Sequence, residues 1–203
     1  MSTRPRLDRP RLDKEAVLVA AEALVEREGW QHLTMTALAN ELGVKVPSLY
    51  NHVPNLDALR GDLQNRALRE LGAALNRTAM GRTGETAMRA LAETFRRFAN
   101  EHPGRYDLAM QAPVDQDAFI AATADAGAAL AAVIRSYGID DSSFELQLSA
   151  FAALHGVLAL EHSGFFPASI DTDKLFEKVL DVVLGLLENA APAAVPPFEV
   201  KAG

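Results

Sequence analysis

A tyrosine, an asparagine and a histidine follow one another in the stretch LGVKVPSLYNHVP, residues 42–54. Pro47 suits the first turn of a helix, because its φ is already helical and a first-turn N–H needs no acceptor within the helix. Pro54 prevents that helix from continuing. The two prolines therefore predict a short helix over about 47–53 that carries three hydrogen-bonding side chains in a row.

The helical periodicity decides which of these side chains face solvent. At 100° per residue, Leu49 and Val53 share one side, which must be core, whereas Asn51 projects from the opposite side. Tyr50 and His52 flank the outward face at its two edges. An amide can bind an adenine edge in the major groove of DNA, and the flanking rings can reach phosphates. The segment therefore predicts a helix that reads DNA.

Two preceding helices would position this segment. Asp13 is typical of a helix N-cap and predicts a helix over about 14–28, while Thr34 predicts one over about 35–42, which Gly43 ends. Two short helices joined by a tight turn, the second of them polar, form a helix-turn-helix motif. The alternative is an ordinary helical corner whose polar residues are merely solvated.

The composition excludes several classes of protein. The chain has 203 residues, of which 49% are hydrophobic, enough for a sizeable core. It has no cysteine, which excludes disulfides, thiolate catalysis and cysteine metal ligands. The N-terminus lacks the apolar segment of a signal peptide, and no uninterrupted apolar run of about 18 residues predicts a membrane span. We expect a cytoplasmic protein with no membrane partner.

Charge is distributed unevenly along the chain. The net charge is −7, which opposes binding to phosphates, but residues 1–77 hold 11 Lys and Arg against 10 Asp and Glu. Residues 78–203 hold 9 against 17, so the acid lies in the second part. We expect residues 1–12 to form a flexible basic arm in which Arg4 and Arg6 contact DNA. A solvated tail without function is the alternative.

Helical periodicity continues to the end of the chain. Apolar residues recur at helical spacing in a long fourth helix that Asn55 caps, in helices at about 116–137 and 171–188, and in one that Asp140 or Asp141 opens. We therefore predict an all-α protein of about nine helices. Its parts are a three-helix, helix-turn-helix DNA-binding domain over 13–60, a helical ligand-binding and dimerisation domain over 61–189, and a flexible tail over 190–203.

The last predicted helix has an apolar stripe that is wider than packing against one neighbour requires. Paired about a twofold axis with the apolar helix FAALHGVLAL, it would form a four-helix bundle between two copies of the chain. A homodimer suits a DNA reader, because two short helices read a palindrome with half-sites about one helical turn apart. Burial within one chain is the alternative. The predicted dimer residues are Leu175, Val179, Val182, Val183 and Leu186.

Aromatic and methionine side chains on inward helix faces are candidates for a small-molecule pocket, and plain core is the alternative. His155 lies within an apolar face and needs a hydrogen-bond partner, either a ligand or a neighbouring carbonyl or glutamate. No set of residues has the spacing of metal ligands, so we expect no metal and no cofactor. The candidate pocket residues are Phe95, Phe98, Tyr106, Met110, Phe119, Phe151 and His155.

The stretch from Thr34 to Leu59, TMTALANELGVKVPSLYNHVPNLDAL, resembles the DNA-binding domain of the tetracycline-repressor (TetR) family. Its part GVKVPSLYNHV is similar to the tetracycline-responsive members. The sequence departs from the family at Leu56, where a lysine that contacts phosphate is usual. The resemblance implies contacts with DNA bases or backbone from Thr34, Thr36, Lys45, Val46, Pro47, Ser48, Tyr50, Asn51 and His52.

The C-terminal part resembles one branch of that family, recognised by a histidine–glycine pair in an apolar helix (WHG-like). The matching stretches are ETFRRFANEHPGRYDLAM, residues 93–110, and FAALHGVLALEHSGFF, residues 151–166, with Phe151 where tryptophan is more usual. The resemblance implies a homodimeric transcription regulator, most often a repressor. Such a protein binds a palindromic operator in double-stranded DNA and is released by a small-molecule effector.

Two other classes of protein compete with this interpretation. An enzyme built on a helical bundle needs Glu-x-x-His on paired helices, and neither that tetrapeptide nor a GxSxG, P-loop or GxGxxG motif occurs. We therefore expect no enzymatic activity. The other class is a dimeric helical module that binds a partner protein and keeps a vestigial DNA-binding domain. Leu56 and the acidic C-terminal part support this alternative.

Overall fold

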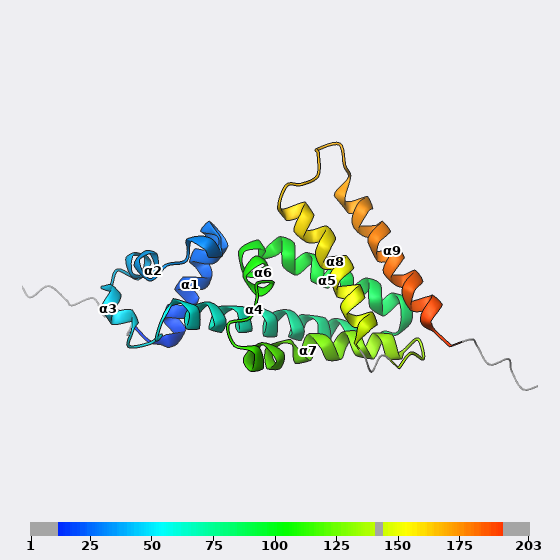
Figure 1. The fold of residues 1–203 in the computed structure, drawn as a ribbon, viewed down its shortest axis with the longest axis horizontal. Helices are drawn as coiled ribbons and strands as arrows, with labels where there is room; N and C mark the ends of the chain where they lie inside the picture. The colour runs from blue at the N-terminus through cyan, green and yellow to red at the C-terminus, as the bar shows by residue number, and fades with distance from the viewer. Residues whose placement is uncertain (1–11, 141–143, 193–203) are drawn as a thin grey trace, which may run out of the picture. The chain divides into compact units, whose positions relative to one another are not determined.

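The chain folds into helices and connecting turns throughout the residues that the structure describes, 12–140 and 144–192 (Figure 1). The structure is a computed structural model. Within these residues it contains nine α-helices and one short 3-10 helix. The prediction of an all-α protein of about nine helices is confirmed, and so are the predicted bounds of the first two helices. In chain order the elements are α1 (Lys14–Glu28), η1 (Trp30–His32), α2 (Met35–Leu42), α3 (Val46–Leu49), α4 (Leu56–Ala79), α5 (Gly84–Glu101), α6 (Pro103–Ala109), α7 (Gln116–Arg135), α8 (Glu145–His162) and α9 (Thr172–Ala190).

The chain divides into two compact units. Residues 1–68 and 101–122 form the first, here called the N-terminal unit, and residues 69–100 and 123–203 form the second, the C-terminal unit. The boundaries fall within α4, at the start of the α5–α6 connection and within α7. As a result α6 belongs to the same unit as α1, α2 and α3, although more than fifty residues of sequence separate it from them.

The N-terminal unit is built on capped helices around one apolar core. Asp13 Oδ1 accepts the N–H of Ala16 at 2.8 Å, and Thr34 Oγ1 accepts the N–H of Ala37 at 3.0 Å. A cap of this kind stabilises a helix by about 1 kcal/mol, which explains why the sequence predicted both starts. The buried core of the unit includes Val17, Ala21, Leu24, Val25, Leu33, Leu38, Leu49, Val53, Leu59 and Leu63.

The helix α3 is shorter than predicted. The prolines predict a helix over 47–53, whereas α3 ends at Leu49. The N–H groups of His52 and Val53 both donate to the carbonyl of Leu49, at 2.9 and 3.0 Å, so the segment continues as a tight turn. The physical reason is Pro54, because a proline drives the preceding residue out of helical backbone and clashes with the carbonyl four residues earlier.

The first turn of α6 packs closely against the last turns of α1. Gly104 is buried there, and a Cβ at this position would overlap the carbonyl oxygen of Val25. The carboxylate of Glu26 accepts the backbone N–H groups of Gly104 and Arg105 at 3.3 and 3.4 Å. A carboxylate from α1 therefore satisfies the otherwise unpaired N–H groups that begin α6, where the helix dipole also favours negative charge.

The opposite end of α6 is held by α4. Gln64, which is 3% exposed, donates its amide N–H to the carbonyl of Gln111 at 2.8 Å and to those of Leu108 and Ala109 at 3.4 Å. These carbonyls belong to the last turn of α6 and the residues that follow it, where a helix leaves its final carbonyls in need of donors from outside; that of Leu108 also accepts the N–H of Gln111 at 3.2 Å. Both ends of α6 are thus bonded to helices of the N-terminal unit.

In the C-terminal unit α8 and α9 pack side by side as an antiparallel hairpin (Figure 1). The helix α8 begins at Glu145, later than the predicted start at Asp140 or Asp141; residues 141–143 lie outside the described part of the chain. The reason is Phe144, whose left-handed backbone (φ 62°) is not part of a right-handed helix.

Arginines of α5 fasten it to α9. Arg89 Nη2 lies 2.9 Å from a carboxylate oxygen of Asp181, and Arg89 Nη1 lies 3.3 Å from one of Glu177. Further along the same helix, Arg96 Nη2 lies 2.7 Å from Asp173. These pairs use part of the acidic charge of the C-terminal unit to hold its own helices together.

One helix of the described residues, α7, is long and apolar enough to cross a membrane by length and composition alone. Alanine is its commonest residue, Asp125 lies within it, and Arg135 ends it. One such helix is weak evidence for a membrane span, so the match by itself assigns α7 no membrane role.

The contact between α6 and α1 predicts that Gly104 tolerates no side chain. We expect Gly104→Ala to lower the free energy of unfolding by about 1–3 kcal/mol, because the added methyl group must push α6 away from the Val25 carbonyl. In a chain of this size each kcal/mol lowers Tm by about 2–4 °C. The matched control is Gly127→Ala in α7, where a Cβ meets no atom within 4 Å. This control should leave Tm unchanged or raise it. An unchanged Tm in Gly104→Ala would contradict the packing described here.

Candidate functional site: a helix-turn-helix surface and an aromatic cluster

The α3 segment, defined here as residues 45–53, presents polar groups on one side and apolar groups on the other. Leu49 and Val53 are fully buried in the core of the N-terminal unit, as the helical spacing predicts. Tyr50 is 52% exposed, and Asn51 is exposed beside it. His52 is half-buried. The segment therefore displays a phenol and an amide to solvent from a base that packing holds in place.

The remaining residues predicted to contact DNA divide by exposure. Lys45, Pro47, Thr34 and Thr36 are exposed, whereas Val46 and Ser48 are half-buried. The hydroxyl of Thr34 is already engaged as the N-cap of α2. The arginines of the predicted arm, Arg4 and Arg6, lie outside the described residues.

The turn between α2 and α3 has defined geometry. Gly43 adopts left-handed backbone (φ 64°) and donates its N–H to the carbonyl of Asn40 at 3.1 Å. The N–H of Val44 donates to the carbonyl of Ala39 at 2.9 Å. This pair of bonds is a Schellman motif, and glycine is the residue that takes its left-handed position without strain. The direction in which the chain leaves α2 for α3 is therefore fixed.

The start of α4 differs from the family pattern in a way that the structure explains. Asn55 Oδ1 accepts the N–H of Ala58 at 2.7 Å and caps the helix. Leu56 is half-buried and packs against the core of the N-terminal unit, so its side chain is used for packing. The first turn also carries the exposed carboxylate of Asp57. This helix start offers backbone N–H groups to a phosphate but no lysine from its first turn.

Sequence reasoning missed the polar contacts that join the helices of this unit. Arg60 of α4 lies over the ring of Trp30, 5.5 Å from its centroid, and Arg27 of α1 pairs with Glu41 of α2. Arg27 and Glu41 are 14 residues apart and Trp30 and Arg60 are 30 apart, so no periodicity within one helix reveals either contact. Only the packing of these helices against one another could have indicated the two contacts.

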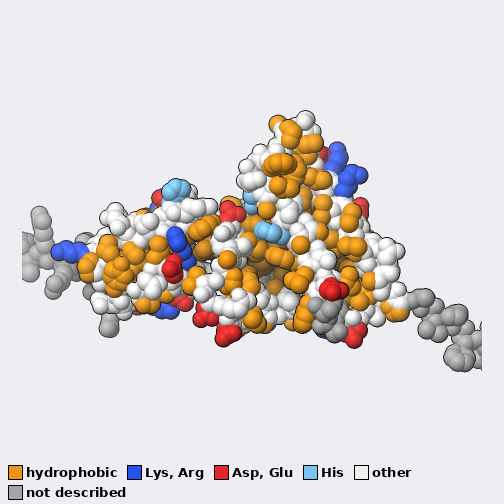
Figure 2. Space-filling view, viewed as in Figure 1, with side chains coloured by type: hydrophobic (Ala, Val, Ile, Leu, Met, Phe, Trp, Pro, Cys, Tyr) orange, Lys and Arg blue, Asp and Glu red, His pale blue; other side chains and the backbone are white. Residues whose placement is uncertain are grey.

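The predicted dimer residues of α9 face two directions. Val182 and Leu186 are 62% and 44% exposed, and Leu175 and Val179 are half-buried. Val183 is 1% exposed and packs within its own chain. The neighbouring helix α8 adds exposed apolar side chains of its own, and hydrophobic side chains gather on the viewed face of the α8–α9 hairpin (Figure 2). The exposed ones on α8 or at its start are Phe144, Leu148, Phe151 and Leu160.

Four of the predicted pocket residues lie in the C-terminal unit, and three of them form an aromatic cluster. The rings of Phe151 and His155 are stacked at 5.5 Å with an interplanar angle of 2°, and Phe151 meets Phe95 edge to face at 6.1 Å. Phe95 and Phe98 are buried, His155 is half-buried, and Phe151 is 40% exposed. The cluster thus runs from the core of the unit to its surface.

The other three predicted pocket residues lie in the N-terminal unit. Tyr106 is 1% exposed, and burial raises the pKa of its phenol, which keeps it protonated. Met110 and Phe119 are half-buried. One groove of the C-terminal unit, of about 320 Å³, contains none of the seven predicted residues. It lies between α5 and α9 and is lined by Arg89, Ala90, Glu93, Phe176, Glu177 and Leu180. Within the described residues no group of three His, Asp or Glu side chains could hold a metal ion.

Comparison with known proteins decides the family. Residues 17–61 match the family described as "Bacterial regulatory proteins, tetR family", and residues 88–183 match "Tetracyclin repressor-like, C-terminal domain". The HTH-type transcriptional regulator Rv0681 of Mycobacterium tuberculosis is 39% identical over 180 residues, which cover 87% of this chain and 82% of that protein. The chain belongs to the TetR family of transcriptional regulators.

Solved structures of the TetR family share the fold. PfmR, a TetR family transcriptional regulator from Thermus thermophilus, has a TM-score of 0.63 at 18% identity, covering 83% of this chain and 97% of that one. A TetR variant from Acinetobacter baumannii AYE in complex with minocycline has a TM-score of 0.66 at 19% identity, covering 90% and 100%. At these identities the likeness concerns the fold alone.

Membership of the TetR family confirms the recognition made from the α3 segment. The family consists of helix-turn-helix transcriptional regulators, not enzymes, and it implies binding to DNA and to an effector. The C-terminal match is to the tetracycline-repressor-like domain, and the assignment to a histidine–glycine branch stays a prediction.

Proposed function

We propose that this TetR family member is a repressor that binds a palindromic operator as a homodimer and leaves it when a small molecule binds. The observation that carries the DNA-binding part is the α3 segment, in which Tyr50 and Asn51 are exposed above the buried anchors Leu49 and Val53. The Schellman turn at Gly43 supports it, because a DNA reader needs its base-contacting side chains at a fixed angle to the scaffold.

We assign roles to the exposed residues by their chemistry. Asn51 is the base reader, since its amide can donate to and accept from one adenine edge. Lys45, Tyr50 and His52 bind phosphates or the edges of the groove. At the start of α2, the hydroxyls of Thr34 and Thr36 bind the sugar–phosphate backbone of the DNA. Val46, Pro47 and Ser48 are small enough to allow close approach to the groove.

The flanking parts of the chain complete the DNA interface. We propose that residues 1–12 are a basic arm whose Arg4 and Arg6 supply phosphate contacts. Leu56 is turned into the core, so the charge that a lysine would give at the start of α4 is missing there. We propose that residues 13–60 form the DNA-binding domain, that residues 61–189 form the ligand-binding and dimerisation domain, and that residues 190–203 are a tail. The protein acts in the cytoplasm, where its DNA is.

Dimerisation is supported by exposed apolar surface on two adjacent helices. Val182 and Leu186 of α9 and Leu148 of α8 leave large apolar side chains in solvent, which does not stabilise a monomer. A twofold pair of α8–α9 hairpins would bury them in a four-helix bundle. A homodimer carries two α3 segments, and a palindrome with half-sites about one helical turn apart needs two readers.

The effector region is proposed at the aromatic cluster of Phe95, Phe151 and His155. Flat rings that reach from core to surface suit a ligand with an aromatic or cationic portion. A distant relative of similar fold, the TetR variant from Acinetobacter baumannii, was solved with the multi-ring compound minocycline, which agrees with a ring-bearing ligand class. We propose that the His155–Gly156 pair marks the histidine–glycine branch of the family.

The helix α6 offers a route from effector to DNA, because it follows α5, the helix of Phe95, directly in the chain and is bonded at both ends to helices of the N-terminal unit. Because α6 is bonded to α1 through Glu26 and to α4 through Gln64, any displacement of α6 must move the helix-turn-helix or break those bonds. Packed elements of this kind shift as units between discrete arrangements. A coupling of about 1–3 kcal/mol between the effector site and DNA is enough for a regulatory response.

A second function is favoured by one observation. The first turn of α4 presents Asp57 to solvent and packs the half-buried Leu56 against the core, which weakens the affinity of this helix start for phosphate. A helical dimer that binds a partner protein and keeps a vestigial DNA-binding domain would show the same two features, an exposed Asp57 and a Leu56 packed against the core. The two functions differ in one cheap measurement, since only the repressor is retained on duplex DNA at low salt.

The reader role of Asn51 gives the test of the proposed function. We expect the wild-type protein to select a palindrome from a pool of random duplexes. We expect Asn51→Ala to lose about 1–3 kcal/mol of discrimination at one base pair per half-site, measured by competition binding. Gln31→Ala removes an exposed amide outside the α3 segment and is the control. If Asn51→Ala keeps the same ratio of specific to scrambled binding, Asn51 reads no base.

The proposed dimer interface is tested by introducing a charged side chain into it. Val182→Glu places a carboxylate in the dimer interface, and an uncompensated buried charge costs about 3–5 kcal/mol, so dimer dissociation should become at least about 100-fold easier. Sedimentation velocity measures this. Val19→Glu on α1 starts from a similarly exposed valine, at 50% against 62%, and should remain dimeric. A dimer in both variants would place the interface elsewhere.

The effector proposal predicts a matched pair of variants. A thermal-shift screen of small aromatic and cationic compounds should find one that raises Tm and also releases the operator. Phe151→Ala should weaken that compound's binding by about tenfold, since it removes the central ring of the cluster. Leu160→Ala removes a side chain of similar exposure on the same helix and should have no effect. Equal loss in both variants would locate the effector outside the cluster.

A further inference from the structure

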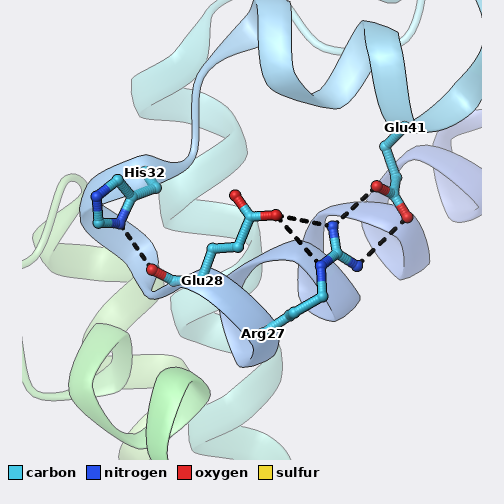
Figure 3. A network of polar contacts seen from close by, with 4 residues as sticks. All are labelled: Arg27, Glu28, His32 and Glu41. Atoms are coloured by element: carbon cyan, nitrogen blue, oxygen red, sulfur yellow. Dashed lines mark hydrogen bonds and ion pairs between the residues drawn. The ribbon is translucent and has the colours of Figure 1, made fainter.

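The guanidinium of Arg27 joins the ends of two helices in the N-terminal unit (Figure 3). Its Nη2 donates to Glu41 Oε2 at 2.9 Å and its Nη1 to Glu41 Oε1 at 3.4 Å, which is a two-point pairing of fork and carboxylate. On the other side, Nε and Nη2 donate to Glu28 Oε1 at 3.2 and 3.1 Å. Two carboxylates therefore hold one guanidinium plane between them.

Because Glu41 lies near the end of α2, its pairing with Arg27 affects the orientation of the α3 segment. Arg27 lies in the last turn of α1, and Glu41 is the penultimate residue of α2. Only Gly43, Val44 and Lys45 separate α2 from α3, and the Schellman bonds fix their path. A small rotation of the C-terminal end of α2 relative to α1 is thus carried directly into the α3 segment.

The geometry of the pair is better than that of an ordinary surface ion pair. Most exposed pairs contribute little, because two long side chains must be ordered in water. Here Glu28 orients the guanidinium for Glu41, and a bidentate arrangement restricts direction as well as distance. The hydrogen bonds that Arg27 donates to Glu41, and secondly to Glu28, raise its pKa above the ordinary value. Arg27 also carries positive charge at the C-terminal end of α1, which the helix dipole favours.

We propose that Arg27 is a positioning residue for DNA recognition, which through its two-point bond to Glu41 sets the angle of α2 and hence of the α3 segment on the duplex. The proposal rests on the proposed operator binding and adds a residue that touches no DNA. A direct phosphate contact by Arg27 is the competing role. The structure argues against it, because three nitrogens of the guanidinium already donate to carboxylates and the cluster of Arg27, Glu28 and Glu41 has a net charge of −1.

The test compares operator binding by four variants with binding by the wild type, using the palindrome that the wild type selects from random duplexes. Arg27→Ala and Glu41→Ala should each weaken operator binding about three- to fivefold, the upper range for a partly exposed pair. The double exchange Arg27→Glu with Glu41→Arg should restore binding to within about twofold of wild type. Arg69→Ala, an exposed arginine of α4, is the control for loss of one positive charge.

Two further readouts separate positioning from other roles. The slope of log K against log salt should be unchanged in Arg27→Ala, whereas loss of a phosphate contact would reduce it by about one ion. Tm should fall by no more than about 2–4 °C in a chain of this size. Unchanged affinity in Arg27→Ala, a double exchange that fails to restore binding, or a reduced salt slope would each overturn the proposal.

Failure of the proposed function has a different signature. If the wild-type protein selects no sequence from the random duplexes and passes through a DNA column at low salt, operator binding itself is wrong, and the positioning role falls with it. If the wild type selects a palindrome and Arg27→Ala binds it equally well, only the role of Arg27 is wrong.

Discussion

The burial of Leu49 and Val53 is the constraint on which the candidate DNA-binding surface depends. These two side chains are fully buried, and in a short segment with helical spacing they determine that Tyr50 and Asn51 point outward. Burying an aliphatic side chain stabilises by about 1.5–3 kcal/mol, which far exceeds the energy of any exposed contact that the segment makes. The outward face can therefore be polar and selected for its partner, because the segment is anchored through its inward face and not through its outward one.

A segment of only four helical residues needs external support, since so short a helix is unstable by itself. The structure supplies this support through backbone geometry at both ends. The Schellman turn at Gly43 fixes the approach from α2, and the paired N–H bonds to the Leu49 carbonyl close the far end before Pro54. The same logic holds for α6, seven residues long, whose two ends are bonded to Glu26 and Gln64. Short helices in this unit are held by their termini.

Local features of this protein could be predicted from sequence, and long-range ones could not. Asp13, Thr34 and Gly43 act on their own neighbours, so they indicated the bounds of α1 and α2 correctly. The extent of α3 was overestimated, because the effect of Pro54 reaches back to the preceding turn. The start of α8 was misplaced because nothing in the sequence predicts left-handed backbone at Phe144. The bonds from Glu26 to Gly104 and from Gln64 to Gln111 span 78 and 47 residues, and no periodicity links such positions. The family resemblance implied a set of DNA-contacting residues, which stays a prediction, and it did not indicate the bonds that hold this part of the chain in place.

The distribution of charge follows from the same division of labour. The C-terminal part of the chain carries most of the acid, and Arg89 and Arg96 consume some of it in bonds between α5 and α9. The excess that remains repels phosphates, so DNA is attracted only toward the part of the chain near neutrality. Within that part, Leu56 packs against the core where a lysine would add charge. Arg27 pairs with Glu41, and Arg60 lies over the ring of Trp30. Among the described residues, structural contacts thus occupy several positions that could have attracted DNA, and Lys45 in the α3 segment is a basic residue that stays exposed.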